Sequence, residues 1–388
     1  MQNIKSNIWK IYCFRFFYSF SLIFPVLMPF YLIHELTTTQ IFVLQSLYVV
    51  FMLFVEIPSG YLSDVIGRKK TLILASFLAS MGIVTYSTTS TFYGFLLAEL
   101  MLGFSDSLLS GTDSALIYDT LLQLKQKDKY KELEGKIRFY MRSGLSIACV
   151  LGVFLAGISL MLPFYINIII TIIPIFIVFS LVEPKRKKLE KQKSHFNKII
   201  QIFLYCCKHS KIRSLMIFSS LVFTMTFLGT WSYYLYYDNL NLGLSYYGIF
   251  LALVMFFIGL GSKQLHLIEK KIKKGIVYLL LFPGIVFLLL GLTNSIFYLL
   301  LIIISAFILG FGSPFVNDHL NKLTKSDIRA TVLSVNSMFG GLFFIIIAPI
   351  FGKFVDLYSV SFAFICAGIL FCIVGIYSIY LLHKNKVI

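Results

Sequence analysis

The chain has 388 residues, of which 58% are hydrophobic and 13% are charged. Soluble proteins average about 45–50% apolar and about 25% charged residues, so a soluble globular protein is excluded. The aromatic content of 17% likewise excludes a disordered chain.

Long, mostly apolar stretches follow one another along the whole chain. A helix needs about 20 such residues to cross about 30 Å of hydrocarbon with its backbone groups bonded internally. Twelve stretches of this kind predict an all-α polytopic membrane protein with 12 transmembrane helices. The predicted spans are 9–33, 41–62, 71–88, 92–116, 137–160, 163–182, 212–237, 245–265, 275–293, 295–317, 329–352 and 359–382. Because the first span lacks a small-residue cleavage site, we expect it to be retained.

Lysine and arginine residues alternate regularly between the loops. Of the 34 in the chain, 31 lie in the terminal segments and in every second loop, and the exceptions are Arg15, Arg142 and Lys353. Basic residues near span ends stay in the cytoplasm, so we predict a multi-pass protein of the cell inner (plasma) membrane with both termini cytoplasmic. Attraction to anionic lipid then explains the net charge of +17, and no nucleic acid partner is expected.

A polar stretch divides the chain into two groups of six spans. We expect an N-terminal six-helix bundle at 1–182, a cytoplasmic linker at 183–211 and a C-terminal six-helix bundle at 212–388. Asp64, after span two, corresponds to Glu269, after span eight, at an offset of 205 residues, and Gly103 corresponds to Gly310 at an offset of 207. Two matches at nearly one offset predict a duplicated six-helix unit, an arrangement that suits alternating access.

The loop between spans two and three contains Gly60, Asp64, Gly67 and Arg68 in the pattern Gly-x-x-x-Asp-x-x-Gly-Arg-Lys. With the span count, the linker and the repeat, this loop resembles the signature of the major facilitator superfamily. The segments Glu56–Gly60, Ser110–Asp119 and Arg329–Ser334 are similar to a bacterial, drug-efflux-like branch of that family. The resemblance implies two pseudo-symmetric halves and secondary active transport.

The signature residues have physical roles that fit a gate. Gly67 permits a turn with positive φ, Asp64 can accept hydrogen bonds from backbone amides, and Arg68 can pair with a carboxylate. The resemblance implies a latch that closes the cytoplasmic side, with Asp64 facing the start of span eleven and Asp113 as a third member. The family's usual arginine after Asp64 is Val65 here. The alternative is a basic turn that is merely solvated.

Two further acidic residues complete the predicted gate. Glu56 lies at the cytoplasmic end of span two, where its carboxylate can reach water, and Glu269 is the counterpart of Asp64 in the second half.

Span four carries three carboxylates at spacings of seven residues, Glu99, Asp106 and Asp113. On a continuous helix this spacing drifts by only about 20° per step, so they predict one acidic stripe. Arg15 and Arg142 enter the membrane at comparable depth, and each can neutralise one carboxylate. Charges in hydrocarbon are costly and mark functional candidates, so we assign proton coupling to this stripe, with Glu99 left unpaired. For Asp106 and Asp113 the alternative is structural ion pairing.

The substrate pathway is predicted mainly from uncharged aromatic and polar residues. Tyr18 in span one lies before a kink expected at Phe24–Pro25, and Asn336 lies in span eleven. The outer end of span seven holds Tyr233, Tyr234 and Tyr237, which favour cationic or apolar solutes if they face inward and form an aromatic belt if they do not. Arg15 and Arg142 complete the candidate substrate-binding residues.

These features predict an antiporter that couples proton entry to the efflux of small amphipathic compounds, including cationic ones. The alternative is a proton-coupled symporter for uptake of an anionic nutrient or metabolite, in which Arg15 and Arg142 bind the substrate.

A membrane-embedded enzyme is the competing class, but the six histidines are scattered and no nucleotide-binding loop occurs. We therefore expect no catalytic residue, no cofactor and no metal, and the expected partners are a small-molecule substrate, protons and the lipid bilayer. A self-contained fold of this kind predicts a monomer.

Overall fold

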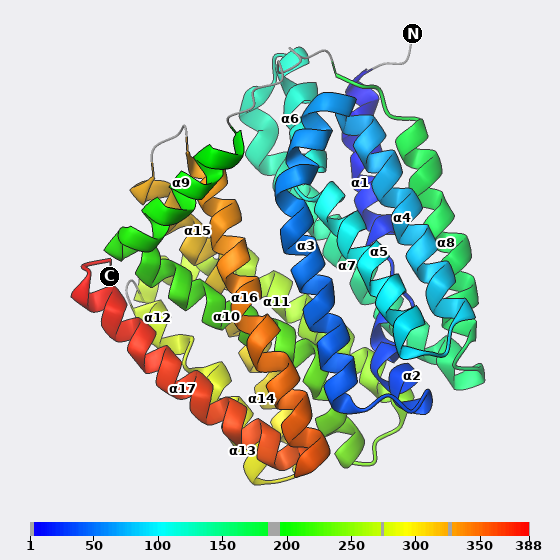
Figure 1. Cartoon of the computed structure of the whole chain (residues 1–388), viewed down its shortest axis with the longest axis vertical. Coiled ribbons are helices and arrows are strands. Elements are labelled where there is room, and N and C mark those ends of the chain that lie inside the picture. The colour runs from blue at the N-terminus through cyan, green and yellow to red at the C-terminus, as the bar shows by residue number, and fades with distance from the viewer. Residues whose placement is uncertain (1–3, 185–194, 273–274, 325–327, 388) are drawn as a thin grey trace. The chain divides into compact units, whose positions relative to one another are not determined.

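The computed structural model describes residues 4–184, 195–272, 275–324 and 328–387, and every regular element in these ranges is helical (Figure 1). The helices of the first half are α1 Asn7–Tyr18, α2 Leu27–Ile33, α3 Thr38–Ile66, α4 Arg68–Thr88, α5 Phe92–Leu109, α6 Thr112–Gln123, α7 Tyr130–Ile158 and α8 Leu162–Phe179. Those of the second half are α9 His195–Lys208, α10 Ser210–Asn239, α11 Leu244–Ile272, α12 Ile276–Leu279, α13 Phe282–Leu292, α14 Tyr298–Leu309, α15 Gly312–Leu323, α16 Arg329–Leu357 and α17 Val360–Lys384.

Most predicted spans correspond to one long helix each. Within the described residues, ten helices are long and apolar enough to cross a membrane, and two shorter apolar segments lie at 24–33 and 277–292. The shorter segments fall at predicted spans one and nine, so the ten long helices correspond to the other ten predicted spans. In span one, α1 ends at Tyr18 and a 3₁₀ turn at Phe24–Val26 leads into α2, which confirms the break expected at Phe24–Pro25.

The two halves repeat each other in helix length. Both α3 and α11 have 29 residues and start 206 positions apart, and α7 and α16 also have 29 residues each. Spans four and ten are both divided into two helices, at Ser110–Gly111 and at Gly310–Phe311. These matched lengths and breaks agree with a duplicated unit. Helix α9 was not predicted, since its residues fall in the expected linker.

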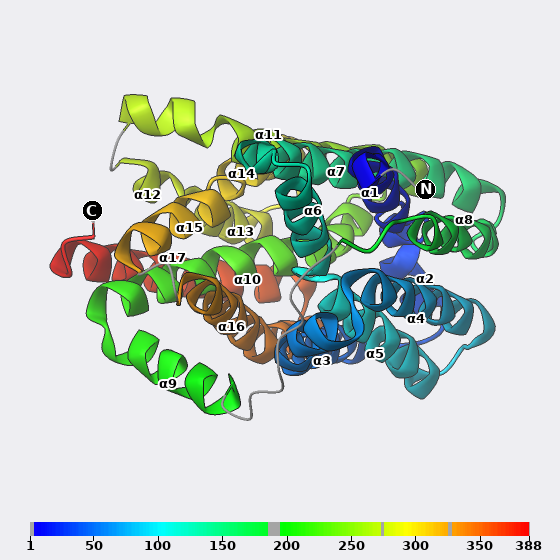
Figure 2. The same ribbon diagram turned by 90° about the horizontal axis from the view of Figure 1, so that it is seen from above.

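The chain forms two compact units. The first comprises Met1–Leu36, Leu47–Lys191 and Leu244–Ala252, and the second comprises Thr37–Ser46, Gln192–Gly243 and Leu253–Ile388. The units follow the sequence halves except that the first turns of α3 and of α11 are exchanged. In the first unit α4 packs against α5 and α8, and α1 packs against α7 and α8 (Figure 2). In the second unit α10 and α13 pack against α16 and α17, respectively.

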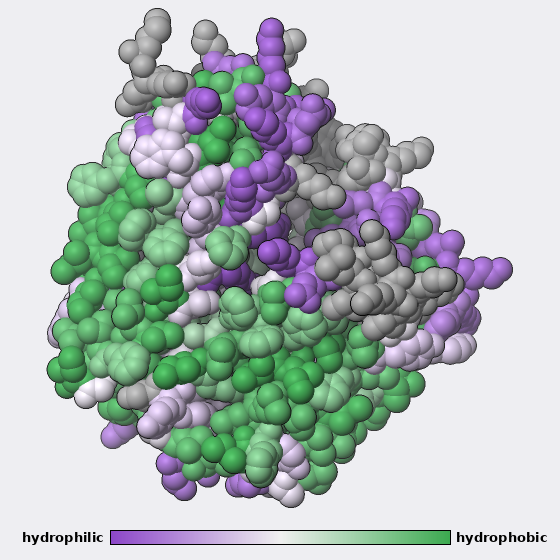
Figure 3. Space-filling model, turned by 180° about the vertical axis from the view of Figure 1, so that it is seen from behind, coloured by the Kyte–Doolittle hydropathy of each residue, from purple (hydrophilic) through white to green (hydrophobic). Residues whose placement is uncertain are grey.

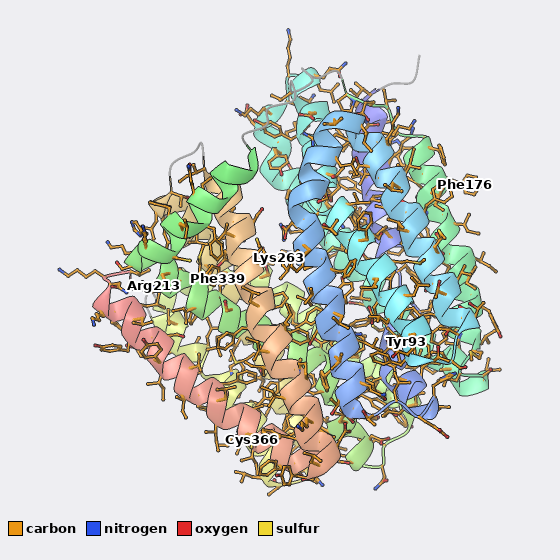
Figure 4. The ribbon with its side chains drawn as sticks, in the orientation of Figure 1. Tyr93, Phe176, Arg213, Lys263, Phe339 and Cys366 are labelled. Atoms are coloured by element: carbon orange, nitrogen blue, oxygen red, sulfur yellow. The ribbon has the colours of Figure 1, made fainter. Side chains whose placement is uncertain are left out.

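The outer surface of the helices is apolar, as a bilayer requires. Phe176 on α8 is 69% exposed and Tyr93 at the start of α5 is 79% exposed (Figure 4). On the face shown in Figure 3, hydrophobic residues cover most of the surface and hydrophilic residues gather toward one end. So much apolar exposure is unusual for a soluble protein and is what lipid-facing helices show.

Candidate functional site

The predicted acidic stripe is divided by a helix break. Glu99 and Asp106 lie on α5, whereas Asp113 lies in the first turn of α6. Gly111 between the two helices has φ of +74°, a left-handed conformation that glycine adopts without steric cost. The regular seven-residue spacing therefore places Glu99 and Asp106 on one helix face, but it does not extend to Asp113.

Asp113 forms an ion pair with Arg15 at the end of α1. Its Oδ2 accepts hydrogen bonds from Nη2 and Nε of Arg15 at 2.5 and 2.6 Å. Asp113 is 1% exposed and Arg15 is 16% exposed, so the pair is largely out of water. This confirms that Arg15 neutralises one of the three carboxylates. The expectation that Asp113 completes the signature latch is wrong, because its partner is on α1.

Asp106 accepts hydrogen bonds from two tyrosines on different helices. The Tyr48 hydroxyl on α3 donates to Oδ2 at 2.5 Å, and the Tyr18 hydroxyl at the end of α1 lies 2.9 Å from Oδ1. Tyr18 also contacts Ser105 Oγ at 2.6 Å, and Ser105 donates to the carbonyl oxygen of Ala75 on α4 at 2.6 Å. A chain of hydrogen bonds therefore joins α1, α3, α4 and α5 around one carboxylate.

Glu99 was predicted to be left without an arginine to neutralise it, and the hydrogen bonds described around it come from tyrosines. It is 4% exposed, and the Tyr31 hydroxyl on α2 donates to its Oε1 at 3.0 Å. The hydroxyl of Tyr31 also lies 2.5 Å from that of Tyr86 on α4. Glu99 is therefore held by neutral donors rather than by a cation in these contacts. Arg142, the other predicted partner of the stripe, lies on α7, which packs against α1.

The signature loop begins α4 and is closed by a carboxylate from the end of the first half. Gly67 is the N-cap of α4 with φ of +113°, as predicted. Glu183 accepts hydrogen bonds from the backbone N–H groups of Arg68 and Lys69 at 2.9 and 2.7 Å. A Cβ on Gly67 would lie 3.1 Å from the Glu183 carboxylate, a tight contact, and the φ of +113° by itself strains any other residue at this position.

Arg68 pairs with a carboxylate, but a different one from that expected. Its Nε lies 3.5 Å from Oδ2 of Asp119 on α6, and its Nη1 donates to Ser63 Oγ at 2.9 Å. Sequence reasoning missed both Asp119 and Glu183 as site residues. Asp119 lies in the segment Ser110–Asp119 that resembles the efflux-like branch, and its position six residues after Asp113 on the same helix was the available signal.

Three predicted gate positions lie outside the side chains that the structure describes. These are Gly60 and Asp64, whose backbone belongs to α3, and Glu269 near the end of α11. Glu56 is partly buried on α3, and its carbonyl oxygen accepts a hydrogen bond from Ser59.

The tyrosines of span seven are mostly buried within the second unit. Tyr233 and Tyr237 are each 2% exposed, and the Tyr237 hydroxyl donates to the carbonyl oxygen of Gly243 at 3.1 Å. These two tyrosines therefore do not form the aromatic belt that was the alternative. Asn336 on α16 donates from Nδ2 to Ser219 Oγ at 3.1 Å, while its buried Oδ1 has no hydrogen-bond partner.

Comparison with known proteins gives a family match. The sequence model of the Major Facilitator Superfamily matches residues 11–348. Over 200 residues the chain is 24% identical to an uncharacterized MFS-type transporter of Methanocaldococcus jannaschii, and the matched segment covers 51% of each chain. The chain therefore spans about half the length of this curated relative.

The fold is similar to those of solved transporters. A variant of the nucleoside transporter NupG matches with a TM-score of 0.80 and 16% identity over 99% of this chain and 100% of that chain. The peptide transporter POT, solved in complex with sulfate, matches with a TM-score of 0.77 and 14% identity over 98% and 94% of the two chains. At these identities the likeness shows the fold alone.

Proposed function

The chain belongs to the Major Facilitator Superfamily, and from this premise we propose that it is a secondary active transporter that exchanges protons for small amphipathic compounds, including cations. Transport by alternating access fits the duplicated six-helix unit. The observation that carries proton coupling is the hydrogen-bond network around Asp106.

The network around Asp106 contains more contacts than its neutral donors have hydrogens. Tyr48, Tyr18 and Ser105 supply three hydroxyl hydrogens for four contacts, namely two to Asp106, one between Tyr18 and Ser105, and one to the carbonyl of Ala75. The Ala75 oxygen can only accept, so the Ser105 hydrogen is committed to it. If Asp106 is protonated and donates to Tyr18, Tyr18 can donate to Ser105, and every contact has its hydrogen.

Loss of that proton breaks one link of the chain between α1 and α5. With Asp106 ionised, Tyr18 must donate either to Asp106 or to Ser105, and the other contact becomes one between two oxygens without a hydrogen. The proton thus changes the number of hydrogen bonds between Tyr18 at the end of α1 and α5, from two to one when it is lost, and a ligand that changes such an interaction can shift a conformational equilibrium. We therefore assign the coupling proton to Asp106 rather than to Glu99.

The charge balance of the same region favours a cationic solute. The Arg15 guanidinium is already neutralised by Asp113, whereas the donors described around Asp106 are the hydroxyl groups of Tyr48 and Tyr18. Ionised carboxylates beside tyrosine rings attract cations, through charge and through the ring face. This balance also weighs against uptake of an anion at Arg15.

The test is proton movement in proteoliposomes that contain a pH-sensitive dye, driven by a gradient of ethidium as the cation. We expect Asp106→Asn to lower ethidium-dependent proton movement at least about tenfold, because a neutral side chain cannot release a proton. Ethidium binding should remain measurable in this variant, although with a higher Kd, because the region loses one carboxylate. Asp128→Asn, at an exposed acid before α7, is the matched control and should behave as wild type.

Two outcomes would change the assignment. If Glu99→Gln abolishes proton movement and Asp106→Asn does not, the coupling proton belongs to Glu99. If only organic anions drive proton movement, and Arg142→Lys raises the transport constant without harming folding, the protein is the uptake symporter instead.

A further inference from the structure

A carboxylate at the end of α16 caps the beginning of α3. Asp356 Oδ1 accepts a hydrogen bond from the backbone N–H of Thr38 at 2.9 Å. Its Oδ2 accepts from the N–H and from the hydroxyl of Thr39 at 2.7 and 2.6 Å. The first N–H groups of a helix lack acceptors within the helix, and its dipole favours a negative charge at that end. Asp356 thus caps the first two N–H groups of α3 from a residue more than 300 positions away, while the Thr37 hydroxyl accepts from the N–H of Gln40 at 3.2 Å.

The same two helices touch closely one turn below the cap. A Cβ on Gly352 would lie 2.8 Å from the carbonyl oxygen of Thr38, so only glycine lets the backbones approach this far. The rings of Phe351 and Phe42 pack edge to face with centroids 5.3 Å apart. The end of α16 therefore holds the first two turns of α3 by a cap, a backbone contact and an aromatic pair.

Helix α3 is divided between the two compact units. Residues 37–46 cluster with the second unit, whereas the rest of the helix, from Leu47 on, clusters with the first. The contact with α16 is what accounts for this division, because it attaches a helix of the first sequence half to a helix of the second. In the predicted topology, the beginning of α3 lies on the outer side of the membrane.

We propose that Asp356 is a latch residue that holds the outer end of α3 against α16, and that its release accompanies opening of the outer side. This inference rests on alternating access as the proposed mode of transport. These hydrogen bonds can break and form again in every transport cycle, because Asp356 is exposed. Water can replace the hydrogen bonds that its carboxylate loses, so the charge stays hydrated.

The experiment measures how often the outer end of α3 becomes accessible. Ser46, 4% exposed, lies two turns after Thr38 and nearly on the same helix face as Thr39 and Phe42. Ser46→Cys, placed in a chain whose six native cysteines are replaced by serine, is labelled with a maleimide in nanodiscs, where both membrane faces are accessible. No substrate or proton gradient is needed, so the result does not depend on the assignment of Asp106.

We expect Asp356→Ala to raise the labelling rate about tenfold, the scale on which a lost capping interaction shifts an equilibrium. Thr39→Val, which removes only one of the three hydrogen bonds, should give a smaller increase in the same direction. Gly352→Ala should also raise the rate, because the added methyl group forces the backbones apart. The matched control is Asp318→Ala, which removes an exposed carboxylate from α15 in the same unit and should leave the rate unchanged.

The proposal is overturned if Asp356→Ala and Thr39→Val both fold and label at the wild-type rate. It is also overturned if Asp318→Ala raises the rate as much as Asp356→Ala does, since the effect would then follow from lost charge alone. Should Asp356→Ala fail to fold, Thr39→Val and Gly352→Ala decide the matter by the same criterion.

Discussion

The two sequence halves contain helices of matching length but distribute charge very differently. At the offset of 207 residues, Glu99, Asp106 and Asp113 of the first half correspond to Ala306, Ser313 and Leu320 of the second. Ala306 and Leu320 are as buried as the acidic residues that they replace, being 1% and 0% exposed. Two of the three corresponding positions are therefore buried in both halves, and among the residues that the structure describes the buried carboxylates, Glu99 and Asp113, lie in the first half.

This difference indicates that the two halves have different roles in transport. A buried carboxylate costs free energy unless its neighbours satisfy it, so it is retained where it does something that alanine or leucine cannot. In the first half each of the three carboxylates has donors on other helices, from Arg15, from Tyr18 and Tyr48, and from Tyr31. Among the residues of the second half that the structure describes, the buried polar side chains are neutral, as at Asn336 and Ser305.

The largest expected effect follows from breaking the buried ion pair. Asp113→Ala leaves the largely buried Arg15 without its carboxylate, and we expect a loss of about 3 kcal/mol in the free energy of unfolding. The exposed pair between Asp318 and Lys322 in the second half is the control, and Asp318→Ala should cost less than about 1 kcal/mol. Thermal unfolding of the purified variants in one detergent measures both.

A double substitution separates charge burial from packing at the same site. Replacing the pair by Arg15→Met with Asp113→Leu should recover most of the loss, because an apolar pair leaves no charge unpaired. If the double variant is as unstable as Asp113→Ala, packing at these positions rather than charge pairing determines the stability.

The next effect concerns the signature loop. Gly67→Ala places a side chain at φ of +113° and 3.1 Å from the Glu183 carboxylate, and we expect a loss of about 1–3 kcal/mol. Gly135 is the matched control, since it lies within α7 and a Cβ there meets nothing within 4 Å. Gly135→Ala should stabilise the protein slightly through better helix propensity, by about 0.5–1 kcal/mol. Equal effects of the two substitutions would show that the loop is not constrained.

Features that depend on local sequence patterns, such as spans and turns, could be predicted from the sequence. Contacts that depend on how the helices pack could not. Hydropathy alone located the spans, because each helix must satisfy the bilayer by its own composition. The positive φ of Gly67 and the break at Phe24–Pro25 were also predicted, since both are local. The pairing of Arg15 with Asp113 was one of several combinations that membrane depth allowed, and depth alone could not select it.

The contacts that sequence reasoning missed all join distant segments. Glu183 caps α4 from a position 115 residues after Arg68, and Asp356 caps α3 from 318 residues after Thr38. A capping carboxylate within one helix has a recognisable spacing, but one from another helix has none. For Glu99 only charged partners were considered, and no sequence pattern indicated the hydroxyl group of Tyr31, which donates to it from α2.

A moderate effect is expected at Glu99. Tyr31→Phe removes the hydroxyl that donates to this buried carboxylate, and we expect the free energy of unfolding to fall by about 1–2 kcal/mol. Tyr93→Phe, at a side chain that is 79% exposed, is the control and should change the stability by less than about 0.5 kcal/mol. An unchanged stability in Tyr31→Phe would mean that Glu99 gains no net free energy from this hydrogen bond.

The smallest effect on stability is expected at Asn336, where the second half would contribute to substrate binding. Asn336→Ala removes a hydrogen bond to Ser219 but also removes a buried oxygen that has no partner, so the two contributions to stability should offset each other to within about 1 kcal/mol. If the unpartnered oxygen receives a polar group of the substrate, the Kd for ethidium, measured by fluorescence anisotropy, should rise several-fold while proton binding at Asp106 stays unchanged. A wild-type Kd in Asn336→Ala would indicate that the substrate, like the proton, binds to residues of the first half. The halves would then differ in substrate binding as well as in buried charge.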